Sequence, residues 1–178
     1  MNLTIRLTTL LLVSTLAAFA HADPVFFAGT GNYYDFITTS VTWVEAEELS
    51  TTTTLFGVQG HLATLTTQEE NDFLLDTFGG ASGWIGLFQE PGSPEPDQGF
   101  GWVTNEELSF TSYNGIEPNN AGGNEQFVEF FNGNWNDLGP TATRRFYVEF
   151  ETSAIPEPSV LPLLTIGMCL FIPTRRRA

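Results

Sequence analysis

The sequence predicts an α+β domain in which two helices precede a set of short strands. Three observations carry this prediction: two capped helical segments in the first half, short apolar strands in the second half, and a long irregular loop over residues 112–124. Helices and strands in separate runs are typical of the α+β class, whereas strict alternation would indicate a parallel sheet. With 178 residues, of which 42% are hydrophobic and 13% aromatic, the chain suits one domain with appended segments.

Each predicted helix begins at a capping box, Thr42-Trp43-Val44-Glu45 in one case and Thr67-Gln68-Glu69-Glu70 in the other. In this motif the threonine accepts from the third helical amide and the glutamate reaches back to the cap. Apolar residues then recur at helical spacing, namely Trp43, Ala46 and Leu49 in the first segment and Phe73, Leu74 and Phe78 in the second. Gly79-Gly80 ends the second helix.

The strands are short segments of aromatic and branched residues. They are expected over residues 32–37, 84–88, 100–104, 127–131 and 146–150. His61 lies in an alternating segment, residues 61–65, which indicates a strand edge and a structural histidine. The loop over residues 112–124 is rich in Gly, Asn and Pro, so its backbone entropy is high and a bound ion would supply the order that apolar burial does not.

Five oxygen-bearing side chains in two neighbouring segments suit a calcium ion. Ca²⁺ takes six to eight oxygen ligands. The candidates are three carboxylates and two amides: Glu117, Asn119, Glu125, Asn136 and Asp137. This set offsets the charge of the ion and leaves coordination positions open for a second ligand. We expect one calcium site there.

Charge and composition exclude several functions. The 21 acidic residues all lie between Asp23 and Glu157, where only two arginines occur and the net charge is −19. Such a surface repels nucleic acid. The single cysteine, Cys169, and the single histidine after residue 22 rule out catalysis by cysteine or by paired histidines. A glycosidase pairing Glu125 with Asp137 is disfavoured, because calcium would hold both carboxylates ionised. We expect no enzymatic activity.

Both ends have the composition of targeting segments. Residues 1–22 combine Arg6, an apolar stretch and Ala20-His21-Ala22, as in a secretory signal peptide, so the domain is expected to span residues 23–154. Residues 155–178 contain Pro156-Glu157-Pro158, a short apolar segment and a final arginine cluster. This order resembles the PEP-CTERM sorting signal of bacteria. The resemblance implies export, transient membrane insertion of the tail, an exosortase as processing partner, and a location at the cell envelope or outside the cell.

The domain itself resembles a C-type lectin-like domain. The matching segments run in the family's order: residues 60–65, 69–74 and 84–87, then Glu117-Pro118-Asn119, Trp135-Asn136-Asp137 and residues 148–150. The resemblance implies two helices, antiparallel sheets and a long loop ordered by calcium, with a cis peptide before Pro118. It assigns Glu117, Asn119, Glu125, Asn136 and Asp137 to both the calcium and the sugar. A Glu-Pro-Asn order further implies a mannose-type preference, whereas galactose-binding members usually carry Gln-Pro-Asp.

The chain departs from the family in lacking its two disulfides, with apolar residues such as Leu55, Phe127 and Val148 at those positions. Asn120 and Gln126 also stand where auxiliary calcium ligands are often acidic, which favours a single ion. The expected function is calcium-dependent binding of a glycan or exopolysaccharide. The alternative is a calcium-stabilised adhesive or structural matrix protein that binds protein partners without recognising sugar.

Overall fold

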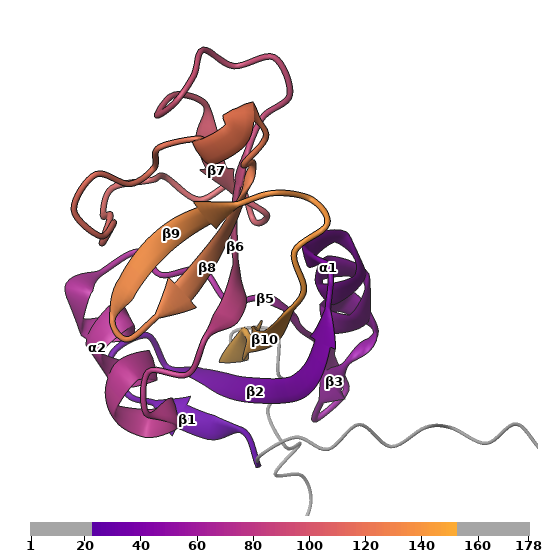
Figure 1. Cartoon of the computed structure of the whole chain (residues 1–178). Coiled ribbons are helices and arrows are strands. Elements are labelled where there is room, and N and C mark those ends of the chain that lie inside the picture. The colour runs from indigo at the N-terminus through magenta and orange to yellow at the C-terminus, as the bar shows by residue number, and fades with distance from the viewer. Residues whose placement is uncertain (1–22, 153–178) are drawn as a thin grey trace, which may run out of the picture.

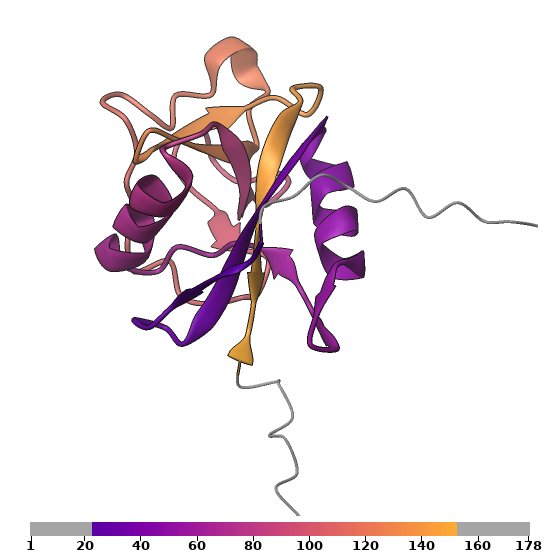
Figure 2. The same cartoon turned by 90° about the horizontal axis from the view of Figure 1, so that it is seen from below.

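Two helices lie on opposite sides of a central pair of strands (Figures 1 and 2). The computed structural model describes residues 23–152, so the predicted signal peptide and sorting tail lie outside the described residues. The pair consists of β2 (Asn32–Val41) and β10 (Arg144–Phe150), joined antiparallel with Phe146 opposite Ile37. These two strands bring the beginning and the end of the domain together.

The sheet extends from this pair in the order β1-β2-β10-β6-β8-β9, with β5 also paired to β10 and β7 to β6. The remaining members are β1 (Val25–Phe27), β5 (His61–Leu62), β6 (Gly83–Gln89), β7 (Phe100–Trp102), β8 (Phe127–Phe131) and β9 (Asn134–Leu138), and a separate hairpin joins β3 (Thr54–Leu55) to β4 (Val58–Gln59). The pairing is antiparallel except between β6 and β10, which run parallel. The predicted α+β class with two helices is confirmed.

The helices form where the capping boxes predict them. In α1 (Trp43–Thr52) the Thr42 side chain accepts from the amide of Glu45, whose carboxylate accepts from the Thr42 amide. The same exchange joins Thr67 and Glu70 at the start of α2 (Gln68–Phe78). Gly79 ends α2 with a φ of 67°, a left-handed conformation that glycine adopts without a steric penalty.

Each helix covers its own apolar cluster. The cluster under α1 includes Trp43, Trp84 and Val148, with Leu55 and Phe127 at its edge. Leu55, Phe127 and Val148, which stand where the resemblance places disulfide cysteines, therefore make apolar contacts instead. The cluster under α2 is built around other side chains, among them Tyr34, Leu74, Ile85, Phe130 and Trp135. The two clusters form the apolar interior of residues 23–152.

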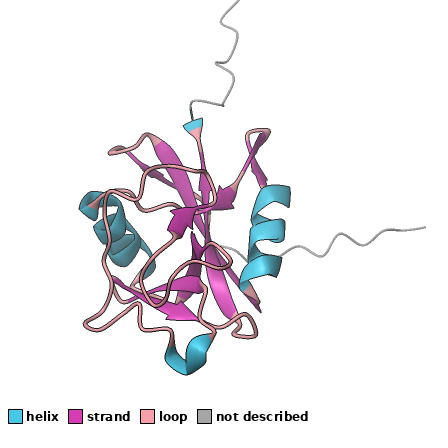
Figure 3. Ribbon diagram, turned by 90° about the horizontal axis from the view of Figure 1, so that it is seen from above, coloured by secondary structure: helices cyan, strands magenta, loops and turns pink. Residues whose placement is uncertain are grey.

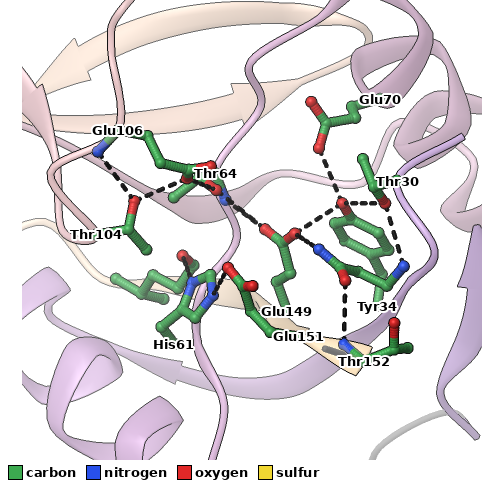
Figure 4. Close-up of polar contacts among 12 residues, drawn as sticks. Thr30, Tyr34, His61, Thr64, Glu70, Thr104, Glu106, Glu149, Glu151 and Thr152 are labelled. Carbon is green, nitrogen blue, oxygen red and sulfur yellow. Dashed lines mark hydrogen bonds and ion pairs between the residues drawn. The ribbon is translucent and has the colours of Figure 1, made fainter. Parts of the chain in front are cut away.

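A buried carboxylate joins several elements of the fold (Figure 4). Glu149 of β10 is 2% exposed, and it accepts hydrogen bonds from the Asn32 amide group, the Tyr34 hydroxyl and the backbone amide of Thr64. The Tyr34 hydroxyl also lies 2.9 Å from Glu70 of α2. His61 has the structural role expected of it, since its Nδ1 contacts the Leu62 carbonyl at 2.9 Å.

No helix within residues 23–152 is long and apolar enough to cross a membrane.

The strands expected over residues 100–104 and 32–37 differ from expectation in length only: β7 stops at Trp102, and β2 continues to Val41. The strand β9, which carries Trp135-Asn136-Asp137, pairs with β8 so that Asp137 faces Val128 and Asn136 faces Glu129. This hairpin fixes the base of the candidate site.

Candidate functional site

The candidate ligands lie where the long loop folds back on the β8–β9 hairpin. The loop connects β7 to β8 and contains one short 3-10 turn, Ala121–Gly123, at the loop end of the domain (Figures 1 and 3). Glu117, Asn119 and Glu125 belong to the loop, whereas Asn136 and Asp137 belong to β9. The fold therefore brings the two predicted segments next to each other.

Asp137 fixes the loop to the strand. Its side chain is fully buried, and its two carboxylate oxygens accept the backbone amides of Asn119 at 3.1 Å and Asn120 at 2.8 Å. Hydrogen bonds to an ionised acceptor are stronger than neutral ones. Two such bonds from one strand residue hold the Glu117-Pro118-Asn119 segment in one place.

Two oxygens in this segment have no protein partner. The peptide between Glu117 and Pro118 is cis, as the resemblance implies. Glu117 Oε2 and Asn119 Oδ1 are both buried and accept no hydrogen bond. Buried acceptors without a partner are rare, and an ion is one of the groups that satisfies them. An acceptor pair of this kind, one carboxylate and one amide, fits a hard cation.

Glu125 and Asn120 shape the far end of the loop. Asn120 has a φ of 48°, a left-handed conformation that asparagine tolerates better than most residues, and its Oδ1 accepts the Glu125 amide at 3.0 Å. The Glu125 carboxylate in turn accepts the amide of Ala121. Asn120 thus acts as a turn residue here, and Glu125 closes the 3-10 turn.

The carboxylates of the site disfavour one another's charge. Burial raises the pKa of Glu117, and the neighbouring carboxylates of Asp137 and Glu125 raise it further. The pKa of Glu125 is raised mainly by burial, with a contribution from Asp137. A bound cation would relieve this mutual repulsion of the carboxylates.

Asn136 also has a contact outside the other four candidates. The Asn136 amide group donates to Glu129 over 3.4 Å, and Glu129 also accepts from Ser82 and Arg144. No group of three or more acidic, histidine or cysteine side chains within residues 23–152 is arranged to hold a metal by itself. The structure therefore places Glu117, Asn119 and Asp137 together, with Glu125 beside them, and leaves the Asn136 side chain in the Glu129 cluster.

Aromatic residues support the site from below. The indole of Trp135 is fully buried and donates to Asn71 of α2 at 2.9 Å. The ring of Tyr113 packs edge-on against Trp135, with 5.7 Å between centroids, and its hydroxyl is buried without a partner. Burial and the nearby Asp137 charge raise the pKa of Tyr113. Tyr113 therefore belongs to the aromatic packing around Trp135.

Two relevant residues escape sequence reasoning. Asn71 is only 1% exposed, and its side chain holds the β8–β9 hairpin by hydrogen bonds to the Trp135 indole and the Gly133 carbonyl. In the sequence it lies among acidic residues at the start of a helix, a pattern typical of solvated surface. Ile116 is 82% exposed directly before Glu117. The sequence does contain a signal for this exposure, because Asn114 and Gly115 favour a loop, and an isoleucine in a loop has no strand or helix face to bury it.

The residues present fit a calcium ion. Glu117 Oε2 and Asn119 Oδ1 offer free acceptor positions, and Asp137 retains lone pairs beyond those used by the two amides. The set is oxygen only, as Ca²⁺ requires, and it lacks the nitrogen and sulfur ligands that transition metals favour.

Comparison with protein families matches residues 39–146, more than half of the chain, to the Lectin C-type domain. Among curated proteins, Halomucin of Haloquadratum walsbyi is 36% identical over 118 residues, covering 66% of this chain and 1% of Halomucin. C-type lectin domain family 4 member K of Homo sapiens is 34% identical over 101 residues, covering 53% of this chain and 27% of the human protein. The chain thus spans a small part of each relative.

Solved structures show the same fold. The cow carbohydrate-recognition domain of CD23, studied in the presence of an oligosaccharide of N-acetylglucosamine and mannose, has a TM-score of 0.60 and 24% identity over 74% of this chain and 96% of that one. The lectin CEL-I from Cucumaria echinata has a TM-score of 0.59 and 21% identity, over 67% of this chain and 89% of that one. The chain therefore belongs to the C-type lectin domain family, whose members are typically non-enzymatic, calcium-using carbohydrate-binding domains.

Proposed function

We propose that this protein binds carbohydrate in a calcium-dependent manner, with a mannose-type preference, at the Glu117-Pro118-Asn119 loop. The observation that carries the proposal is the pair of buried, unpartnered oxygens on Glu117 and Asn119. The two backbone hydrogen bonds accepted by the Asp137 carboxylate hold their segment in place. Family membership supports the carbohydrate-binding role. The order of acid and amide in the loop supports the preference for mannose.

The chain's own residues would orient the sugar by hydrogen bonding. The Glu117 carboxylate accepts a hydrogen bond from one sugar hydroxyl, and the Asn119 amide group donates one to the neighbouring hydroxyl. Calcium, held by Glu117, Asn119 and Asp137 with Glu125, would supply the positive charge that attracts both hydroxyl oxygens. The backbone amides on Asp137 keep the loop in position before the sugar arrives, so little ordering entropy is lost on binding.

The Asn136 NH₂ group donates to Glu129, so Oδ1 is the atom that would join this set. The Asn136–Glu129 bond is long, at 3.4 Å, and Glu129 keeps the closer partners Ser82 and Arg144 without it. The Asn136 amide group can therefore adjust toward the ion while Glu129 keeps its main partners. We propose that Asn136 Oδ1 is the fifth oxygen ligand of the ion.

A second candidate is an adhesive or structural protein in which calcium orders the loop and another protein is the partner. The exposed Ile116 beside Glu117 favours it, since an apolar side chain at a loop tip suits a protein contact as well as a sugar. This candidate predicts that calcium stabilises the domain and that no glycan binds.

For the cellular setting, we propose export and display at the cell envelope or outside the cell, in contact with a glycan or exopolysaccharide. The signal peptide of residues 1–22 and the order of motifs in residues 155–178 support it. Recognition by an exosortase and transient membrane insertion of the tail belong to the same proposal.

A glycan array probed with residues 23–154, in calcium and after chelation, tests the proposed function. We expect signals for mannose- and fucose-type glycans that vanish on chelation and in Asn119→Ala. A folded domain that gives no glycan signal in either condition, while calcium raises its melting temperature, would support the adhesive candidate instead.

A further inference from the structure

A cleft lies next to the segment that follows the proposed calcium loop. It encloses about 420 Å³ between the loop over residues 90–99, the start of β8 and Pro140. Its lining includes Gln126, which directly follows Glu125 in the chain. The volume falls within the range of small-molecule sites in proteins. None of the five candidate calcium ligands lines this cleft.

The floor of the cleft is aromatic and rigid. Phe88 and Phe127 both line it, and both rings pack on the buried indole of Trp43. Phe127 stacks on Trp43 at 4.7 Å between centroids with an interplanar angle of 18°, and Phe88 packs at 5.5 Å. Pro91 and Pro140 add further apolar surface to the walls.

Hydrogen bonds hold both ends of the loop over residues 90–99, which forms one wall of the cleft. The backbone of Gln89 donates to Gln126 at 2.8 Å, and the Glu90 amide donates to the Gly99 carbonyl at 2.8 Å. The Gln89 side chain, 3% exposed, donates to the Gln98 carbonyl at 2.9 Å and reaches Glu95 at 3.4 Å. Preformed walls reduce the entropy that a ligand must offset on binding.

The charge in the cleft is negative and uncompensated. Glu90 and Glu95 line it, and no basic side chain does. The two arginines of the described residues are engaged elsewhere: Arg144 pairs with Glu129 at 2.6 Å, and Arg145 lies over the Phe36 ring at 5.1 Å. The preferred ligand is therefore a cation.

The chemistry of the walls favours an organic ammonium group over a metal ion. Only two carboxylates line the cleft, fewer than a metal site is built from in the described residues, whereas aromatic faces attract an ammonium group and carboxylates pair with it. The remaining apolar surface suits the carbon skeleton of a sugar ring. Gln126 lines this cleft and directly follows Glu125, so the cleft adjoins the loop proposed to hold a sugar.

We propose that this cleft binds an amino sugar with a free amine, as a second glycan subsite that works without calcium. The inference rests on the proposed function in assuming that the ligand is a glycan. The ammonium group lies between Glu90 and Glu95, and the ring packs against Phe88 and Phe127. The two sites together would select a polysaccharide that contains unacetylated amino sugar units.

The test is calorimetric titration of residues 23–154 with a glucosamine tetramer and, separately, with the N-acetylglucosamine tetramer, both in chelator. Chelation removes the ion from the calcium loop, and acetylation removes the charge while keeping the sugar. We expect the glucosamine tetramer to bind and its acetylated counterpart not to bind. The double variant Glu90→Gln, Glu95→Gln should weaken binding by about tenfold or more, because both counter-charges are lost.

Two control variants distinguish binding in this cleft from general charge attraction and from binding at the calcium loop. The double variant Glu69→Gln, Asp76→Asn removes the same charge from α2, which does not line the cleft, and should change the affinity by less than about twofold. Asn119→Ala should leave it unchanged, so that failure of the calcium site and failure of this subsite are distinguishable. No binding in chelator, equal weakening by both double variants, or loss in Asn119→Ala would each overturn the inference.

Discussion

Replacing Asp137 by asparagine separates the structural part of the site from its metal-binding part. Asp137 is fully buried, and each of its oxygens accepts one backbone amide, from Asn119 at 3.1 Å and from Asn120 at 2.8 Å. In Asp137→Asn one oxygen becomes an NH₂ group that faces an amide donor. One charge-assisted bond becomes neutral and the other is lost, leaving a buried amide unsatisfied. Bonds to charged groups contribute about 1.5–3 kcal/mol each, so the free energy of unfolding should fall by about 2–4 kcal/mol.

This loss is expected even in chelator, because the amides are bound without any ion. Asn119→Ala is the matched comparison: the Oδ1 atom it removes has no protein partner, so in chelator the variant should lose no more than about 0.5 kcal/mol. In calcium both variants should lose the added stability that the wild type gains from the ion. Urea denaturation followed by circular dichroism, with and without calcium, measures all four values.

Equal stability of Asp137→Asn and the wild type in chelator would contradict this prediction. So would a metal-free Asn119→Ala domain that is destabilised as strongly as Asp137→Asn, since the side chain of Asn119 would then have a partner that the structure lacks.

Three more predictions concern other contacts of the domain. Burial raises the pKa of Glu149 above its usual value of 4.5, so protonation of this side chain stabilises the folded state. This contribution to the free energy of unfolding is fully present below pH 4.5 and is lost as the pH rises through the folded-state pKa. Urea midpoints in chelator should therefore fall from acidic to neutral pH, and Glu149→Gln should flatten the slope; an unchanged slope contradicts this. Trp135→Phe leaves the Asn71 oxygen without its donor and should cost about 2–3 kcal/mol of unfolding free energy, whereas a loss under about 0.5 kcal/mol would show that the bond is unimportant. The double change Glu117→Gln, Asn119→Asp should move array signals from mannose-type to galactose-type glycans, and an unaltered pattern would show that other groups set the preference.

Local signals predicted the helices well. Both capping boxes lie within four residues of sequence, so the start of α1 at Trp43 and of α2 at Gln68 is visible without any tertiary information. The parallel pairing of β6 with β10 is different, because it joins Gly83 to Arg145 across the chain and depends on how the last strand enters the sheet. Segments as short as β1 and the β3–β4 hairpin carry too few residues for a periodic pattern.

The candidate site divides in the same way. The residue types and their order indicated an oxygen site, but the sequence did not show that Asp137 would bind the loop backbone through both oxygens. Nor did it show that the Asn136 side chain would turn to Glu129, since that contact depends on the register of β8 against β9. The burial of Glu149 among Asn32, Tyr34 and Thr64 combines residues from separate parts of the chain, which no local pattern encodes (Figure 4).

Sugar is proposed to bind at the Glu117-Pro118-Asn119 loop only when calcium is present. Calorimetric titration of residues 23–154 with methyl α-mannoside, first in calcium and then in excess chelator, measures this dependence. We expect saturable heat at one site in calcium, none in chelator, and none for Asn119→Ala in either condition. Binding that persists in chelator, or that survives Asn119→Ala in calcium, would contradict the proposed site.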